Sequence, residues 1–106
     1  MNYRYMRIIV MFDLPTTSSH DLREYTRFRK FLVKNGFIMM QESIYNKIVL
    51  NLTAAEAMIG NIRKNKPEDG LVQVLTLTEK QFSKMEIIVG SVKTEVLNSD
   101  DRLVIL

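Results

Sequence analysis

The order of apolar and polar residues divides the chain into short segments that alternate between strand and helix patterns. Residues 5–12 are rich in Ile, Val, Met and Phe and have no helix start signal, and Pro15 follows soon afterwards. This pattern predicts a buried strand, because proline cannot donate to the hydrogen-bond ladder of a sheet. Serines and threonines at 16–19 precede a helical pattern over 20–35, and Gly36 is a typical C-terminal stop. We therefore expect a strand followed by a helix.

The rest of the chain repeats this alternation. An extended segment covers 37–50, and its polar step at 46–47 is the expected hairpin turn. Residues 53–56, Thr-Ala-Ala-Glu, have the form of a capping box and predict a second helix, which ends by Pro67. A last strand is expected over 71–78.

The expected order is therefore strand, helix, strand, strand, helix, strand. This is the split βαβ plan of the ferredoxin-like fold, an α+β architecture with an antiparallel sheet and both helices on one face. We predict that residues 1–85 form this domain and that two short apolar stretches within 86–106 form accessory strands. An apolar sheet face without helices must be buried against a partner or a ligand.

Alternation along the first strand assigns its side chains to the two faces of the sheet. The more apolar set is expected under the helices: Met6, Ile8, Val10 and Phe12. The other set is expected on the uncovered face, toward a second copy of the chain: Tyr5, Arg7, Ile9, Met11 and Asp13. Because Ile9 and Met11 make the uncovered face apolar as well, the pattern favours a homodimer.

The composition narrows the chemistry that such a fold can carry. The chain has 106 residues, of which 46% are hydrophobic and 25% charged, and this balance is typical of one compact globular domain. Its lack of cysteine and its single histidine, His20, exclude disulfides, thiolate metal sites, a cysteine nucleophile and multi-histidine zinc sites. The apolar run at 8–12 is too short for a signal peptide or a membrane span, so we expect a cytoplasmic protein.

Fifteen Lys and Arg residues exceed twelve Asp and Glu residues, and four of these cations follow one side of the first helix. We call this set the basic ridge: Arg23, Arg27, Lys30 and Lys34. Their spacing of four, three and four places them opposite the apolar stripe that we expect to face the core: Leu22, Tyr25, Phe28 and Leu32. Cations in line without interleaved acids repel one another, and the phosphates of a nucleic acid would relieve that repulsion.

The alternative interpretation of the basic ridge is a solvated helix face. Nucleic acid is then expected at the basic end of the second helix, around Arg63, Lys64 and Lys66. Arg29 lies nearer the apolar side of the first helix and requires an acidic partner or a place in an interface.

Asp13 is the candidate for metal chemistry. A carboxylate at the end of a buried strand is most often a turn or capping acceptor. It is also the type of ligand that Mg²⁺ takes, usually one or two carboxylates with water and phosphate oxygens. No second carboxylate is expected nearby, because Asp21 and Glu24 belong to the helix, but a two-fold axis through the uncovered face would bring two copies of Asp13 together.

Three motifs stand out together: Phe12-Asp13 at the end of the first strand, Arg27-x-x-Lys30-x-Leu32 leading to Gly36, and Gln41-x-Ser43-Ile44-Tyr45. As a set they resemble a known family, the second of the numbered families of CRISPR-associated (Cas) proteins, whose members are small adaptation proteins. The N-terminal sequence is most similar to that of members from systems that use a single large RNA-guided nuclease.

This resemblance implies a homodimer packed sheet to sheet, in which the tail strands complete the sheet of the partner subunit. It implies that the dimer bridges the CRISPR integrase and holds the duplex DNA of a captured fragment for insertion into the repeat array. Family members are also described as Mg²⁺-dependent endoribonucleases or deoxyribonucleases, and Asp13 matches their metal-binding aspartate. The adaptor role is expected to be independent of this catalysis.

Two other functions remain open. One is a toxin-like ribonuclease of the same fold. The other is a ferredoxin-like regulatory domain that binds a metabolite, although such domains usually have glycines where a small ligand approaches the backbone, and the glycines here are explained by helices and turns. A serine hydrolase with Ser43 as nucleophile and His20 as base is disfavoured, because the sequence offers no orienting acid.

Overall fold

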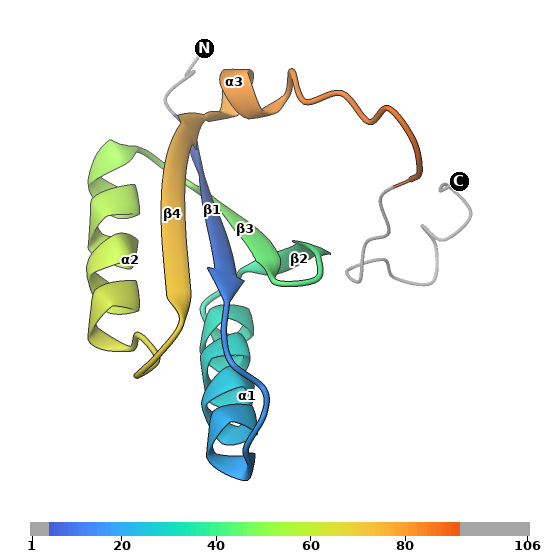
Figure 1. Ribbon diagram of the computed structural model, residues 1–106. Helices are drawn as coiled ribbons and strands as arrows, with labels where there is room; N and C mark the ends of the chain where they lie inside the picture. Colours follow the sequence, from blue (N-terminus) through green and yellow to red (C-terminus); the bar gives the residue numbers. More distant parts are fainter. Residues whose placement is uncertain (1–4, 92–106) are drawn as a thin grey trace, which may run out of the picture.

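A computed structural model describes residues 5–91 of the chain. Within that range the chain forms four strands and three helices (Figure 1). In chain order they are β1 Met6–Asp13, α1 Ser19–Lys34, β2 Ile38–Gln41, β3 Ile44–Val49, α2 Leu52–Lys64, β4 Leu71–Thr78 and α3 Glu79–Phe82. The strands make one antiparallel sheet in the order β2-β3-β1-β4. This arrangement confirms the predicted α+β, ferredoxin-like architecture.

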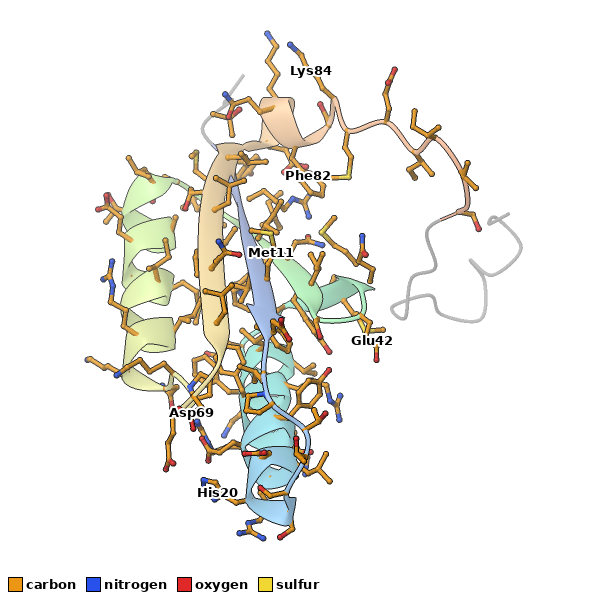
Figure 2. The ribbon with its side chains drawn as sticks, viewed as in Figure 1. Met11, His20, Glu42, Asp69, Phe82 and Lys84 are labelled. Carbon is orange, nitrogen blue, oxygen red and sulfur yellow. The ribbon has the colours of Figure 1, made fainter. Side chains whose placement is uncertain are left out.

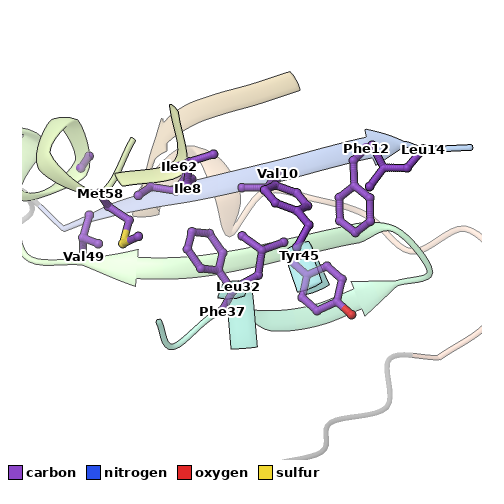
Figure 3. Packing of buried hydrophobic residues seen from close by; sticks show 12 residues of the cluster. Ile8, Val10, Phe12, Leu14, Leu32, Phe37, Tyr45, Val49, Met58 and Ile62 are labelled. Carbon is purple, nitrogen blue, oxygen red and sulfur yellow. The ribbon is translucent and has the colours of Figure 1, made fainter. Parts of the chain in front are cut away.

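The hydrophobic core lies between one face of the sheet and the helices α1 and α2. On β1, Ile8 and Val10 are fully buried and Phe12 is 6% exposed, while Met6 packs at the margin, so the predicted inward set is confirmed. Figure 3 shows Ile8, Val10 and Phe12 packed against residues from the other elements. The core residues contributed by the two helices are Phe28, Leu32, Ala55, Met58 and Ile62. Both helices therefore cover the same face.

One member of the predicted apolar stripe is not in the core. Leu22 is 50% exposed, whereas Tyr25 is partly buried and meets the edge of the Phe12 ring at 5.8 Å between centroids. The reason is visible in Figure 1, where the first turns of α1 extend beyond the end of the sheet. The sheet therefore offers Leu22 no apolar surface.

The ends of α1 agree with the sequence signals. Ser18 is the N-cap, and its hydroxyl accepts a hydrogen bond from the Asp21 amide while the Asp21 carboxylate accepts one from the Ser18 amide. This reciprocal capping box satisfies two amides that have no partner inside the helix. Asn35 is the C-cap, and Gly36 follows with φ +91°, a conformation that glycine adopts without strain.

The predicted hairpin turn is wrong. Residues 42–43 form the turn between β2 and β3, with Ser43 at φ +66°, whereas Asn46 and Lys47 lie inside β3 opposite Ile9 and Ile8. Asn46 is only 7% exposed, and its side-chain oxygen accepts a hydrogen bond from Arg7 at 2.8 Å. A polar residue that suggested a turn is therefore held in a strand by a partner distant in sequence.

The predicted capping box of α2 is also wrong in position. The helix begins at Leu52, and its N-cap is Asn51, whose side chain accepts a hydrogen bond from the Ala54 amide at 2.8 Å. Thr53 lies inside the first turn. The helix ends at Lys64 with Asn65 as C-cap, before Pro67 as expected.

No long helix formed by residues 5–91 lies on the second face of the sheet, and we call this face the open face. The strand register places the following residues on it beside Arg7, Ile9 and Met11: Ile38, Ile44, Asn46, Ile48, Leu71, Gln73, Leu75 and Leu77. Leu71 is 54% exposed, and Leu75 and Ile48 are each 47% exposed, whereas Ile9 is only 7% exposed. The open face is therefore apolar and largely uncovered, with Met11 near its middle (Figure 2).

The short helix α3, which was not predicted from the sequence, is fixed at one end of the open face. The Arg7 guanidinium pairs with both carboxylate oxygens of Glu79, donates to Asn46 and stacks over the Phe82 ring, 4.3 Å from its centroid. A second capping box, between Thr78 and Gln81, starts the helix directly at the end of β4. These contacts link β1, β3 and the segment that leaves the sheet.

The accessory strands predicted over 86–106 remain a prediction. Residues 86–91 have no regular secondary structure, and residues 92–106 lie outside the described part of the chain. Among residues 5–91, no helix is long and apolar enough to cross a membrane.

Candidate nucleic-acid interface and metal ligand

All four residues of the basic ridge are exposed on the outer side of α1, away from the buried Phe28 and Leu32. Three of them border a shallow surface hollow. Its lining residues are His20, Leu22, Arg23, Glu24, Thr26, Arg27 and Lys30. The ridge therefore presents its positive charge to solvent along one helix.

The ridge is not free of acids, contrary to the prediction. Glu24 lies one turn before Arg27, and its two carboxylate oxygens accept hydrogen bonds from the Arg27 Nε and Nη2 atoms at 3.2 and 3.1 Å. These hydrogen bonds hold the pKa of Glu24 below the usual glutamate range. The charge of Arg27 is therefore compensated within the helix, unlike the charges of the other ridge cations among residues 5–91.

Arg27 also binds the chain that follows α2. Its Nη1 atom donates to the carbonyl oxygen of Asn65 at 3.2 Å, and its Nη2 atom donates to that of Lys66 at 3.3 Å. A guanidinium has five N–H groups, and these contacts with Glu24, Asn65 and Lys66 occupy four of them. Arg27 is thus largely committed to contacts inside the chain.

The basic end of α2 lies next to the ridge as a result. Arg63, Lys64 and Lys66 are exposed, and the carbonyl group of Lys66 is bound by Arg27 of the ridge. The two locations that the sequence offered as alternatives for nucleic acid are therefore neighbours on one surface.

Asp13 is the last residue of β1, lies opposite Leu71 of β4 and is exposed. Its backbone is packed closely against Gly70, which has φ +98°, and a Cβ atom at Gly70 would come within 2.8 Å of the Asp13 carbonyl oxygen. The tight entry into β4 thereby fixes the end of β1. Asp13 is held in place by backbone packing, with its carboxylate at the edge of the open face.

Asp13 is not part of a cluster of metal-ligating side chains in the described part of the chain. Within residues 5–91, no three His, Asp or Glu side chains are grouped so that they could hold a metal ion. The carboxylate supplies the hard oxygen donor that Mg²⁺ prefers, but it supplies only one. Mg²⁺ bound at Asp13 would take further oxygen ligands from water, a second copy of the chain or a substrate phosphate.

The structure does not bring Ser43 and His20 together as a catalytic pair. The Ser43 hydroxyl lies 3.3 Å from the Tyr25 hydroxyl, in the turn between β2 and β3. His20 lies in the first turn of α1 and pairs with Glu68, 3.1 Å between Nε2 and Oε1, and both side chains are exposed. Each side chain is explained by a local structural contact.

Arg29 has a partner that is not an acid. It lies beside the hydroxyl of Tyr45, whose pKa is raised by burial and lowered in smaller part by this guanidinium. Tyr45 is 2% exposed and stacks on Phe12 with 5.8 Å between ring centroids. Tyr45 is therefore a core residue, and Arg29 covers its polar end.

The contacts of Arg27 differ in how far the sequence could predict them. The spacing of Glu24 and Arg27 is that of an ion pair on one helix and was available from the sequence. The carbonyl oxygens of Asn65 and Lys66 are distant in sequence from Arg27, so that contact carries no local signal.

Comparison with known proteins shows similarity along most of the chain. The family model described as CRISPR associated protein Cas2 matches residues 6–85. The CRISPR-associated endoribonuclease Cas2 of Treponema denticola is 57% identical over 101 residues, which cover 95% of this chain and 100% of that protein. Proteins with the same name from Streptococcus mutans and Lacticaseibacillus rhamnosus are 48% and 42% identical over 101 residues, covering 95% of this chain and 93% and 100% of theirs.

Proposed function

The chain belongs to the Cas2 family of CRISPR-associated proteins, and on that premise we propose that it acts in CRISPR adaptation as a DNA-holding adaptor. In this role a homodimer binds the duplex of a captured fragment and presents it to the CRISPR integrase. One observation carries the proposal: the apolar open face and the basic ridge lie on opposite sides of the chain. Pairing two chains through the open face leaves both ridges exposed.

The exposed apolar side chains of the open face support the dimer. Leu71, Leu75 and Ile48 each expose about half of their surface, and they lie on adjacent or nearby strands. A contiguous apolar sheet face of this kind is normally buried against a partner. A second copy of the chain, paired through the same face, would bury these side chains symmetrically.

The ridge geometry supports binding to a phosphate backbone without reading of the base sequence. From Arg23 to Lys34 the ridge extends about 16 Å, at about 1.5 Å per residue of helix. Side chains on a straight helix surface can reach phosphates without entering a groove. With Arg27 committed elsewhere, the ridge cations that have no ion pair among residues 5–91 are Arg23, Lys30 and Lys34.

The experiment is duplex binding, measured by fluorescence anisotropy across a salt series with several unrelated sequences. Three phosphate contacts at about 0.9 each give a log–log salt slope of about −2.7 for each protomer engaged. With one protomer engaged, affinity should therefore fall about 40-fold between 50 and 200 mM salt, and more steeply with two, and it should be similar for all duplexes. No binding, salt-independent binding or strong sequence preference would contradict the proposal.

A nuclease activity is a second candidate function, favoured by the names of the relatives, which are called endoribonucleases. We propose that two copies of Asp13, brought together by the dimer, supply the carboxylates of a Mg²⁺ site. When bound, Mg²⁺ would polarise a phosphodiester and activate water. What the chain itself contributes is the position of Asp13, which the packing of Gly70 against the end of β1 holds at the edge of the open face.

This activity is tested with purified protein, RNA and DNA substrates, and Mg²⁺ or a chelator. Asp13→Ala should abolish Mg²⁺-dependent cleavage. Glu42→Gln is the matched control, because Glu42 is an exposed acid in the turn between β2 and β3 (Figure 2). Cleavage that persists in purified Asp13→Ala protein would assign the activity to another site or to a contaminant.

A further inference from the structure

The segment that joins α2 to β4 is held against α1 by side chains of that helix. Arg27 donates to the carbonyl oxygens of Asn65 and Lys66, and His20 pairs with Glu68. Pro67, between these contacts, is buried. Residues 65–68 therefore follow the position of α1, and the backbone of Lys66 is fixed beside the ridge.

The cations of this surface differ in what they can offer to a phosphate. Four of the five N–H groups of Arg27 are used, and its charge is paired with Glu24. Lys66 and Lys30 are exposed, and within residues 5–91 neither has a carboxylate oxygen within 4.0 Å. A strong phosphate contact needs a cation with free donors and uncompensated charge, which describes the two lysines.

We infer that Arg27 is a positioning residue, which holds Lys66 beside the basic ridge so that Lys66 and Lys30 contact the same phosphate backbone. This inference rests on the proposed binding of duplex DNA. The binding surface then includes α1 and the segment that joins α2 to β4. Arg27 acts through the geometry of its planar guanidinium and does not itself need to contact phosphate.

The Arg27→Lys variant separates the geometry of the side chain from its charge. Arg27→Lys keeps the positive charge, but a single ammonium cannot reproduce the planar fork that binds a carboxylate and two carbonyl groups together. If Arg27 acts by positioning, Arg27→Lys should weaken duplex binding as much as Lys66→Gln does. Removal of one phosphate contact corresponds to about eightfold in affinity at 0.1 M salt and to about 0.9 in the salt slope, for each protomer engaged.

Lys66→Gln keeps the hydrogen bonds of Arg27, because Arg27 binds the backbone carbonyl of residue 66 and not its side chain. The substitution should therefore leave the fold and the thermal unfolding temperature unaltered. Lys84→Gln is the matched control, since Lys84 is an exposed lysine at the end of the molecule opposite His20 (Figure 2). It should leave duplex affinity unchanged.

The decisive comparison is the double variant with Arg27→Lys and Lys66→Gln, measured by anisotropy at several salt concentrations. It should bind no more weakly than Lys66→Gln alone, because Arg27 acts only through Lys66. Wild-type affinity in either single variant, or additive losses in the double variant, would overturn the inference while leaving duplex binding intact. Absence of duplex binding by the wild-type dimer, or an equal loss in Lys84→Gln, would instead overturn the proposed function.

Discussion

The open face makes a quantitative prediction about dimerisation at Leu75. This side chain is on β4, lies beside Ile9 of β1 and is 47% exposed. Full burial of a leucine side chain contributes roughly 1.5–3 kcal/mol, so burying the exposed half contributes about 1 kcal/mol. A two-fold interface contains this contact twice, and Leu75→Ala should therefore cost about 2 kcal/mol, or about 30-fold in the dimer dissociation constant.

Leu75→Lys should have a larger effect. It removes the same apolar contact and adds two ammonium groups that must be desolvated without partners, at several kcal/mol each. The dimer should therefore be absent at micromolar concentration, while the monomer stays folded because position 75 is half exposed in a single chain. Ile9→Lys is a poorer probe, since Ile9 is only 7% exposed and its replacement would damage the fold itself.

Sedimentation velocity over a concentration series measures these effects, with circular dichroism as the check on folding. Leu52→Lys is the matched control, because Leu52 is 53% exposed but lies at the start of α2, on the other side of the sheet. It should leave the association unchanged. The reasoning is refuted if Leu75→Lys protein dimerises like the wild type, or if Leu52→Lys disrupts the dimer as strongly.

Further predictions concern stability. Gly60 lies inside α2, and a methyl group added there would have no atom within 4 Å, so Gly60→Ala should stabilise the protein by about 0.8–1 kcal/mol in thermal unfolding. Gly70→Ala should destabilise it by at least about 1–3 kcal/mol, because φ is +98° and the new methyl group would meet the backbone of Asp13 and Leu14; a neutral result would contradict this packing. Because the pKa of Glu24 is lowered in the folded state, its pairing with Arg27 stabilises the fold above the ordinary glutamate pKa of about 4.3 and is lost as the pH falls through the folded value. The unfolding temperatures of wild-type and Glu24→Gln protein should therefore converge at acid pH, and a constant difference would show that ionisation of Glu24 is not its source.

Local sequence signals were sufficient to predict features that depend only on the residues of one helix or strand. Alternation in β1 gave the correct inward set, and the serines before α1 gave its start, because each signal concerns groups a few residues apart. The capping box of Thr78 and Gln81 was equally visible in the sequence, and it marks the helix α3 that was not predicted. At α2 the sequence signal at Thr53 was two residues late, because the side chain of Asn51 caps the helix instead.

Local sequence signals did not predict the conformation or contacts of residues that depend on a partner distant in the sequence. Asn46 is typical of turns, yet Arg7 binds its side chain and keeps it in a strand. The ridge was predicted in the right place, but the commitment of Arg27 to residues 65 and 66 arises only from tertiary packing. The magnesium site that we propose at Asp13 would use a carboxylate from a second chain, and neither the sequence nor the described residues of one chain show such a donor.

Expansion of the repeat array in cells tests the central claim, that this protein serves adaptation by holding DNA and not by cleaving it. The cells supply the integrase and the array, and new spacers are counted by sequencing for three forms of this chain. Asp13→Ala should acquire spacers at the wild-type frequency, whereas the combined replacement of Arg23, Lys30 and Lys34 by glutamine should lose acquisition while still forming dimers. Loss of acquisition in Asp13→Ala, or normal acquisition without the three cations, would contradict the account.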